Sequence, residues 1–523
     1  MSPRPRCTGA LCQPSRGRTV TTSADEKTEG KVSLPTLTAM VIGSMIGSGV
    51  FLLPRRFGAE AGVAGALIAW IIAGTGMLML AFVFQRLATR KPDLDAGVYA
   101  YAKAGFGDYV GFNAAFGFWA SACAGNTSYW VLIMATSSAL FPALGSGDTV
   151  IAVLVASVGV WLFCYLILRG VKEAAIINRI ATVAKIIPIL VFIVIAIIAF
   201  QADVFTANFW GGDGNYSWNS LFEQAKGTML ITVFVFMGIE GASVYSRFAR
   251  KRADVGRATV IGFLSVLAVF MLVTLCSYGV LPQDELGRVD DPPMAAVLES
   301  VVGPWGSVFI RIGVLLSVLG AYLAWTLMAA EILYLPAKND DMPKFLARVN
   351  GQGAPVYALV MATGLVQLLL ILVLFTSNAL DFMLDLTAAL ALIPYLLAAA
   401  YALKLTITRE TYGDRRSLVP DMVVAALATV YTLFLVYAAG WDHLLLSCLL
   451  YAPGALLYVL ARRERGLRVF RPVEAVLCGV IVLGAVGAVV SLATGAIQLD
   501  LPNPVEPTGL VHLPDPAETT GVK

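Results

Sequence analysis

Residues 43–54 read GSMIGSGVFLLP and place three glycines and two serines inside the first strongly apolar stretch of the chain. Each glycine weakens a helix by about 1 kcal/mol relative to alanine. A backbone break at membrane depth is tolerated only where it is packed inside protein or lines a cavity. Two interpretations follow. One is a close helix contact through small residues, for which Gly43 and Gly47 have the GxxxG spacing. The other is an unwound segment whose free N–H groups bind an anion, helped by the dipole of the following half-helix.

The composition is that of a membrane protein with many spans. The chain has 523 residues, of which 58% are hydrophobic and 14% are charged. Apolar runs of about 20 residues recur along nearly the whole length, and each is long enough to cross a bilayer. We therefore predict an all-α polytopic membrane protein with about 13 transmembrane helices. These spans lie at roughly 35–57, 63–86, 108–141, 149–168, 176–200, 222–247, 257–281, 304–336, 355–376, 380–405, 418–439, 441–461 and 473–496.

Charge distribution orients these spans. Arginine and lysine gather in the N-terminal tail and in the connections that follow even-numbered spans, and they are scarce in the other connections. This bias predicts a cytoplasmic N-terminus, an external C-terminus and a place in the plasma membrane, which for a bacterium is the inner membrane. Residues 1–33 have no apolar signal-peptide core and are expected to be a disordered cytoplasmic tail, and 497–523 a disordered external one.

Several functions are excluded or disfavoured by residue usage. The net charge of +3 is too small to indicate nucleic-acid binding. The seven cysteines show no metal spacing and no disulfide framework, and two histidines make a His-based metal or catalytic site improbable. We therefore expect no metal and no cofactor.

A second break lies in the sixth predicted span. Residues 232–251 read TVFVFMGIEGASVYSRFARK, with Gly238, Gly241 and Ala242 around the carboxylate Glu240. Spans 1 and 6 hold matching places in two sets of five, and a set with an odd number of spans is followed by one inserted upside down. Paired glycine-interrupted spans are typical of inverted-repeat transporters, whose site lies between the breaks near the midplane.

The predicted organisation follows from these two breaks. A transport core would cover 34–405, with one repeat at about 35–200 and the other at about 222–405, and three additional transmembrane helices would cover 406–496.

Four stretches together resemble the amino acid–polyamine–organocation superfamily. Besides GSMIGSGVFLLP they are RKPDLDAGVYAYAKAGFGDYVGF (90–112), VFMGIEGASVYS (235–246) and YLPAKNDDMPKFLARVN (334–350). Within that superfamily the chain looks like the basic amino acid/polyamine antiporters, closest to the arginine/ornithine antiporters, over about residues 33–496. A thirteenth span also suits that subgroup. The resemblance implies a 5+5 inverted-repeat fold with broken helices 1 and 6, and a secondary transporter rather than an enzyme.

The resemblance also implies a substrate site. The α-carboxylate would take donors from Ser48 and Gly49, and the α-ammonium would take carbonyls of Met45 and Met237 at the two breaks. The cationic tail would meet acceptors and an aromatic face from three further positions, which are Asn126, Trp325 and Thr387. From the residues alone, Trp325 is better interpreted as an ordinary packed or interfacial aromatic. For Asn126, an interhelical hydrogen bond is as well supported as a ligand contact.

Gating and coupling residues are implied in the same way. Phe234 is the eighth expected substrate-binding residue, and it stands where the family usually has a tryptophan that closes over the substrate; the aromatic face is kept, but the N–H is lost. Glu240, Phe118 and Tyr395 match a distal gate, and the alternative for Glu240 is a satisfied structural partner. Lys185 matches a span-5 lysine that stands where sodium-coupled relatives bind sodium; its alternative is a side chain that snorkels to the cytoplasmic interface.

The function expected from the resemblance is uptake of L-arginine against export of L-ornithine by alternating access. A lysine permease, or an exchanger of a basic amino acid for an amine such as agmatine or cadaverine, stays open. An embedded enzyme is disfavoured because Asp381 and Asp385, although spaced i,i+4, have no accompanying motif. A channel is disfavoured because no filter sequence repeats. The expected partners are cationic amino acids and the lipid bilayer, with no nucleic acid, and a homodimer is left open.

Overall fold

The computed structural model describes residues 33–497 apart from 95–96, 171–173, 213, 215, 242–251, 377 and 414. Side chains at 174–183, 252–253 and 415–416 are also outside the description. The two terminal tails predicted at 1–33 and 497–523 therefore lie almost entirely outside the described residues.

The described residues form helices and no β-strand, which confirms the predicted all-α class. The helices of the first half are α1 (Leu34–Met45), η1 (Gly49–Leu52), α2 (Leu53–Glu60), α3 (Val63–Arg90), α4 (Val98–Phe106), α5 (Asp108–Ser137), η2 (Pro142–Leu144), α6 (Val150–Leu168), α7 (Ala174–Ile198) and α8 (Ala202–Ala207). Those of the second half are α9 (Trp218–Gly227), α10 (Met229–Phe236), α12 (Arg252–Ser277), α13 (Gln283–Leu286), α14 (Pro293–Val302), α15 (Pro304–Lys338), η4 (Lys344–Ala347), α16 (Val356–Val373), α17 (Ala379–Thr408), α18 (Arg415–Arg463) and α19 (Pro472–Ala493).

Within the described residues, eight helices are long and apolar enough to cross a membrane, and nine if the bent pair α1–α2 is one span. The chain is thus a multi-pass membrane protein, and the predicted number of 13 spans stays a prediction. The spans predicted at 418–439 and 441–461 share the label α18 but are two helices, separated by a kink at Gly440, where φ is 74°.

The first predicted break is present. α1 ends at Met45, Ile46 is extended with ψ of 102°, and the helix axis bends by 52° before it continues through η1 and α2. A Cβ added to Gly43 would meet no described atom within 4 Å, and one on Gly47 would make only an ordinary 3.7 Å contact. The interpretation of this stretch as a tight GxxxG seam is therefore wrong.

The second break follows α10. Helix α10 ends at Phe236, Met237 leaves the helix with ψ of 139°, and Gly238 has φ of 100°. Only glycine adopts this left-handed region without steric cost, so the residue type is required here. The continuation predicted for this span, 242–251, lies outside the described residues.

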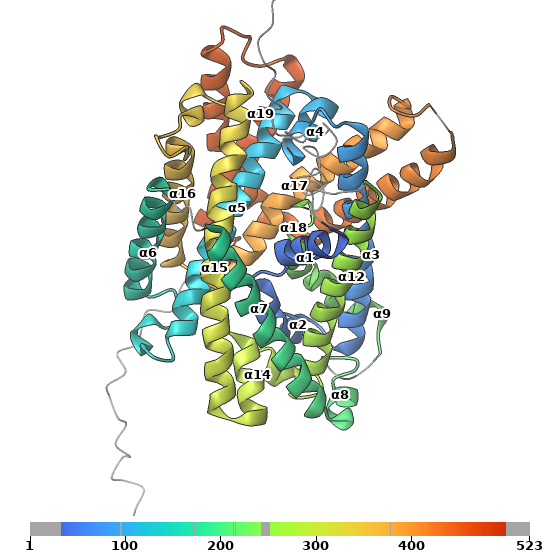
Figure 1. The fold of residues 1–523 in the computed structure, drawn as a ribbon, viewed down its shortest axis with the longest axis vertical. Helices are drawn as coiled ribbons and strands as arrows, with labels where there is room; N and C mark the ends of the chain where they lie inside the picture. The colour runs from blue at the N-terminus through green and yellow to red at the C-terminus, as the bar shows by residue number, and fades with distance from the viewer. Residues whose placement is uncertain are drawn as a thin grey trace, which may run out of the picture.

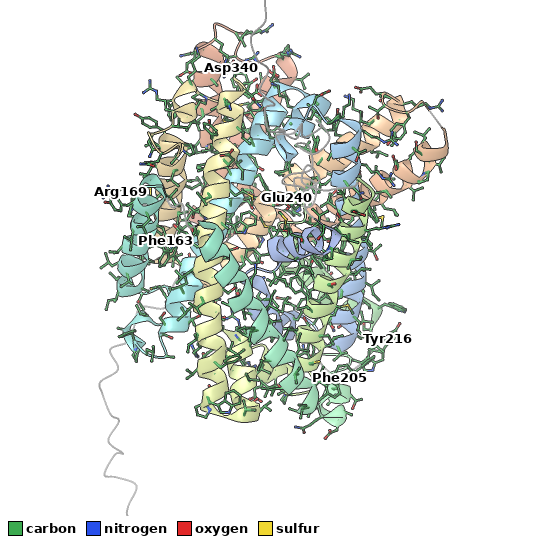
Figure 2. The ribbon with its side chains drawn as sticks, in the orientation of Figure 1. Phe163, Arg169, Phe205, Tyr216, Glu240 and Asp340 are labelled. Atoms are coloured by element: carbon green, nitrogen blue, oxygen red, sulfur yellow. The ribbon has the colours of Figure 1, made fainter. Side chains whose placement is uncertain are left out.

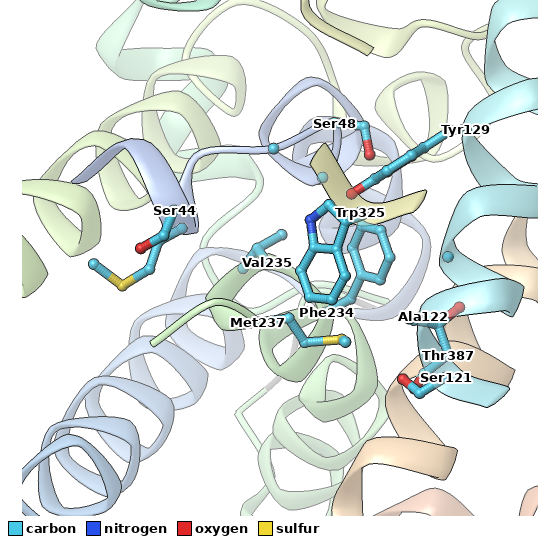
Figure 3. A pocket seen from close by; sticks show the side chains of 14 residues that line it. Ser44, Ser48, Ser121, Ala122, Tyr129, Phe234, Val235, Met237, Trp325 and Thr387 are labelled. Carbon is cyan, nitrogen blue, oxygen red and sulfur yellow. The ribbon is translucent and has the colours of Figure 1, made fainter. Parts of the chain in front are cut away.

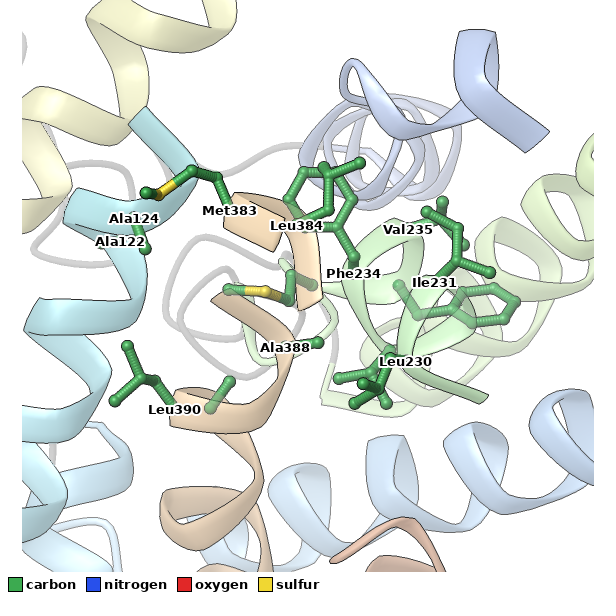
Figure 4. Packing of buried hydrophobic residues seen from close by; sticks show 14 of the residues in the cluster. Ala122, Ala124, Leu230, Ile231, Phe234, Val235, Met383, Leu384, Ala388 and Leu390 are labelled. Carbon is green, nitrogen blue, oxygen red and sulfur yellow. The ribbon is translucent and has the colours of Figure 1, made fainter. Parts of the chain in front are cut away.

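Helix α5 is the centre of the bundle and packs against α15, α16 and α17 (Figure 1). Nearly every residue from Tyr109 to Thr136 is buried. Its small residues allow neighbours to approach closely: a Cβ on Gly117 would overlap the Tyr451 hydroxyl. Figure 4 shows where α5 and α17 meet α10, with Ala122, Leu384 and Phe234 among the packed side chains. By contrast, α6 and α19 keep most of their apolar side chains exposed, as helices that face lipid do.

The connections separate to the two ends of the bundle. α4 lies at one end, and α8 and α14 lie at the other (Figure 1). At the α14 end, five charged side chains form what we term the α2 charge cluster; these are Arg55, Arg56, Asp291, Asp381 and Asp385.

In this cluster the Arg55 guanidinium lies 2.8 Å from Asp381 and 3.4 Å from Asp291, and that of Arg56 lies 2.5 Å from Asp385. Asp291 lies in the connection before α14, outside the membrane-spanning helices. Burial raises the pKa of the Asp291 carboxyl to about 6, against the opposing effect of Arg55. The cluster therefore joins α2 to α17 and to the α13–α14 connection.

Candidate substrate site

The two breaks meet. A Cβ added to Gly238 would lie 2.3 Å from the carbonyl oxygen of Ser44, in the last turn of α1. A Cβ on Gly49, after the first break, would lie 2.6 Å from Val235 Cγ1 and 2.9 Å from the Phe234 ring on α10. Since real Cβ atoms do not approach other atoms so closely, glycine at both positions is what lets the breaks touch.

A small cavity lies beside this contact. Seven of the eight residues predicted to bind substrate line it, and they come from both breaks, α10, α15 and α17 (Figure 3). These seven are Met45, Ser48, Gly49, Phe234, Met237, Trp325 and Thr387. No charged side chain is among its lining residues in the described part of the chain.

One wall of the cavity offers hydrogen-bond donors. Within the described residues, no backbone hydrogen bond uses the amide of Gly47, Ser48 or Gly49. The Ser48 hydroxyl is also buried; it donates to no backbone group there and lies beside the Tyr129 hydroxyl. Buried polar groups are normally paired, so this wall is suited to an anionic group that accepts from all of them.

Lys185 lies behind the same break. Its Nζ donates to the carbonyl of Gly43 at 2.8 Å and to that of Ile46 at 2.7 Å. These carbonyls have lost the helical N–H partners that residues 47 and 50 would have supplied. The ammonium is therefore directed into the break, rather than toward the end of the bundle.

Asn126 is the predicted substrate residue that does not line the cavity. Its Nδ2 donates to the Thr326 hydroxyl at 3.3 Å, which joins α5 to α15 as the structural alternative expects. Its Oδ1 is buried and has no partner in the described residues. The acceptor that would serve a cationic tail is thus unpaired. Thr326, to which Asn126 donates, directly follows Trp325 on α15.

Trp325 and Thr387 lie on walls formed by other helices (Figure 3). The Thr387 hydroxyl donates to the Met383 carbonyl at 2.6 Å, so toward a substrate it can act only as an acceptor. The Ser121 hydroxyl donates to the Thr387 carbonyl at 2.7 Å and fixes α5 against α17.

The predicted distal gate residues are brought together. Tyr395 on α17 donates to Glu240 Oε2 at 2.8 Å, and the Gly238 amide donates to the same oxygen at 3.2 Å. The rings of Phe118 and Tyr395 have centroids 6.1 Å apart. Glu240 lies in the interior, about midway between the ends of the bundle (Figure 2). The carboxylate thus holds the second break against α17; its gating role stays a prediction.

Three polar lining residues were missed by the sequence analysis, namely Ser44, Ser121 and Tyr129. Tyr129 was open to prediction, because it follows Asn126 by three residues and so shares a helix face with it. Ser121 depends on the crossing of α5 and α17, which no local pattern reveals. Among the described residues, no group of three or more His, Cys, Asp or Glu side chains could hold a metal ion.

Sequence comparisons agree with this geometry. Residues 32–443 match the amino acid permease family. The chain is 49% identical over 481 residues to an arginine/ornithine antiporter of Pseudomonas aeruginosa, covering 91% of this chain and all of the relative.

Two further relatives carry other names. An L-lysine transport protein of Corynebacterium glutamicum is 40% identical, covering 90% of this chain and 97% of its own. An arginine/agmatine antiporter of Chlamydia trachomatis is 38% identical, and the match covers 81% of this chain and 88% of the relative. With a family match over most of its length and relatives this similar, the chain belongs to the amino acid permease family.

Proposed function

We propose that this protein exchanges cationic amino acids across the bacterial inner membrane, taking up L-arginine and exporting L-ornithine by alternating access. The observation that carries the proposal is the cavity where the two breaks meet. Among the described residues, its amide donors on one wall have no backbone partner, an indole forms another wall, and no lining side chain is charged. The similarity to arginine/ornithine antiporters supports the same substrates.

The two ends of the substrate would use different walls. Its α-carboxylate would accept from the amides of Gly47–Gly49 and from Ser48, and its cationic tail would lie on Trp325. A desolvated cation–π contact contributes about 2 kcal/mol. The absence of a lining carboxylate keeps the bound cation free of a strong ion pair, which suits a carrier that must release its ligand.

The proposed orientation places the N-terminus in the cytoplasm and the C-terminus outside. The basic connections then lie on the cytoplasmic side with α4, and α8 and α14 lie on the external side with the α2 charge cluster. Domain limits of 34–405 for the core and 406–496 for the additional helices remain part of the proposal.

Proteoliposomes test the exchange directly. Vesicles that hold the purified protein and internal L-ornithine should accumulate labelled L-arginine, and vesicles without internal substrate should not. Label that enters both kinds of vesicle equally would overturn the exchange mechanism and favour a permease.

Membrane potential separates the alternatives within the exchange class. Arginine and ornithine each have one net positive charge, so their exchange moves no net charge and should not respond to an imposed potential. Exchange of arginine for agmatine, which has two positive charges, would respond. A competition panel of arginine, ornithine, lysine, agmatine and cadaverine then ranks the substrates.

Two substitutions test the cationic subsite. Trp325→Ala and Asn126→Ala are each expected to abolish arginine exchange while the protein still inserts into the membrane. Trp305→Ala is a matched control, because Trp305 lies on the same helix, is 55% exposed and is remote from the cavity. Near-normal exchange in either cavity variant would remove that residue from the subsite.

A further inference from the structure

Five hydroxyl-bearing side chains line the cavity, and three have already committed their protons. Ser44 donates to the Val41 carbonyl at 2.8 Å, and Ser121 and Thr387 donate to backbone carbonyls at 2.7 and 2.6 Å. The remaining two hydroxyls belong to Ser48 and Tyr129. In the described part of the structure, neither of these donates to a backbone carbonyl.

Tyr129 brings its hydroxyl to the wall of free amides. It lies on α5 and is 5% exposed. Its hydroxyl oxygen would lie 3.7 Å from a Cβ added to Gly47, and it points toward the Ser48 hydroxyl (Figure 3). Two hydroxyls, one in the break and one on α5, therefore converge on amides that have no backbone partner among the described residues.

We propose that Tyr129 is a specificity-determining residue that donates its hydroxyl to the substrate carboxylate, and so makes this site prefer amino acids over the amines formed by their decarboxylation. The inference rests on the proposed function. An ionised carboxylate has about four acceptor positions on its two oxygens, enough for the amides and both hydroxyls. Donors from α1–η1 and α5 would then clasp the carboxylate from two sides.

The preference follows from unpaired donors. A ligand without a carboxylate, such as agmatine, leaves the hydroxyls and amides of this wall buried and unsatisfied. A site built to bond a polar group strongly rejects the analogue that lacks it for this reason. Removing the Tyr129 hydroxyl should weaken the binding of arginine. It should not weaken the binding of agmatine, because agmatine has no carboxylate to receive that hydrogen bond.

The test compares Tyr129→Phe with the wild type in the full-length protein. Uptake of labelled L-ornithine into arginine-loaded proteoliposomes is inhibited by unlabelled L-arginine or by agmatine. For Tyr129→Phe, the arginine concentration that halves uptake should rise about 10-fold, and the agmatine value should stay within about 2-fold. If agmatine inhibits ornithine uptake by the variant and not by the wild type, the proposal is supported more strongly.

Tyr109→Phe is the matched control, since Tyr109 is a buried tyrosine of the same helix that does not line the cavity. It should leave both values unchanged. If Tyr129→Phe weakens inhibition by both ligands equally, the hydroxyl has a structural role and the proposal is overturned. The proposal is also overturned if agmatine inhibits uptake by neither the wild type nor the variant. Failure of the wild type to exchange arginine for ornithine would instead overturn the proposed function, before the variant is compared.

Discussion

Helix α2 carries Arg55 and Arg56 into the carboxylates of Asp291, Asp381 and Asp385, whereas α1, the other half of the same broken span, has no charged side chain. α1 instead packs along α12, and its last carbonyls receive Lys185. One half is fixed by ion pairs to another helix, and the other packs on apolar surface and is held by Lys185.

Of the two halves, α1 can move at the lower cost. Sliding α1 along α12 exchanges one apolar contact for another. Separating α2 from α17 must part buried or half-buried charges, and leaving one of these unpaired is costly. We therefore expect α2 to separate from α17 only when the α2 charge cluster is rearranged. We expect the position of α1 to depend on the hydrogen bonds from Lys185.

Among substitutions that test the two halves of the broken span, Lys185→Met should have the largest effect. It removes both hydrogen bonds to the carbonyls of Gly43 and Ile46 and keeps a long apolar side chain. Each buried carbonyl left without a partner costs about 1–3 kcal/mol, so we expect arginine exchange to fall by 30-fold or more, roughly, in proteoliposomes. The control is Lys226→Met, because Lys226 pairs at the surface with Glu223. Exchange within about 3-fold of the wild type would mean that Lys185 does not hold the break.

Gly49→Ala should come next. Its Cβ would strike Val235 and the Phe234 ring, and relieving this overlap costs about 1–3 kcal/mol, so we expect a 10- to 100-fold loss of exchange, roughly. Gly43→Ala is the matched control on α1, where a Cβ meets no described atom, and it should leave exchange intact and stabilise the helix by about 1 kcal/mol. Equal losses in the two variants would contradict the close contact between the breaks.

Charge reversal in the α2 charge cluster should have a smaller effect that is partly reversible. Arg56→Asp places like charges together and should lower exchange about 10-fold. Adding Asp385→Arg should restore part of the exchange activity, because the ion pair is formed again with its two charges exchanged. Reversing the exposed pair Lys226–Glu223 should change nothing measurable. A double variant no better than the single one would show that the pair does not hold α2 to α17.

The class of fold and both breaks were predictable, because glycine-rich interruptions in apolar spans leave few alternatives at membrane depth. The positions of Ser48, Trp325 and Thr387 around one cavity followed from the resemblance rather than from local pattern. The role of Gly43 was not predictable. GxxxG spacing in a sequence cannot say whether a neighbouring helix approaches, and here it is Gly49 that another helix touches.

The α2 charge cluster shows a different limit. Asp381 and Asp385 were recognised as an i,i+4 pair, but nothing in the sequence joins them to Arg55 and Arg56, more than 300 residues away. Tertiary packing of α2 on α17 makes that connection. Tyr129 was missed for a different reason: its spacing from Asn126 pointed to the same helix face, but an aromatic residue in a buried helix is far more often packing than a ligand contact.

The smallest expected effect is a pH dependence of stability in the α2 charge cluster. Three carboxylates face two guanidiniums there, and Asp291 is the carboxylate whose burial raises its pKa to about 6, with Asp290, Asp381 and Arg56 also close. Because the folded protein holds this proton at higher pH than the unfolded chain, the stability is fully present below about pH 4 and is lost as the pH rises through about 6. Asp291→Asn cannot ionise, so relative to the wild type its thermal midpoint should rise by about 2 °C between pH 4 and pH 7, whereas the exposed control Asp284→Asn should follow the wild type. A difference between Asp291→Asn and the wild type that does not change with pH would show that Asp291 is not the group that titrates.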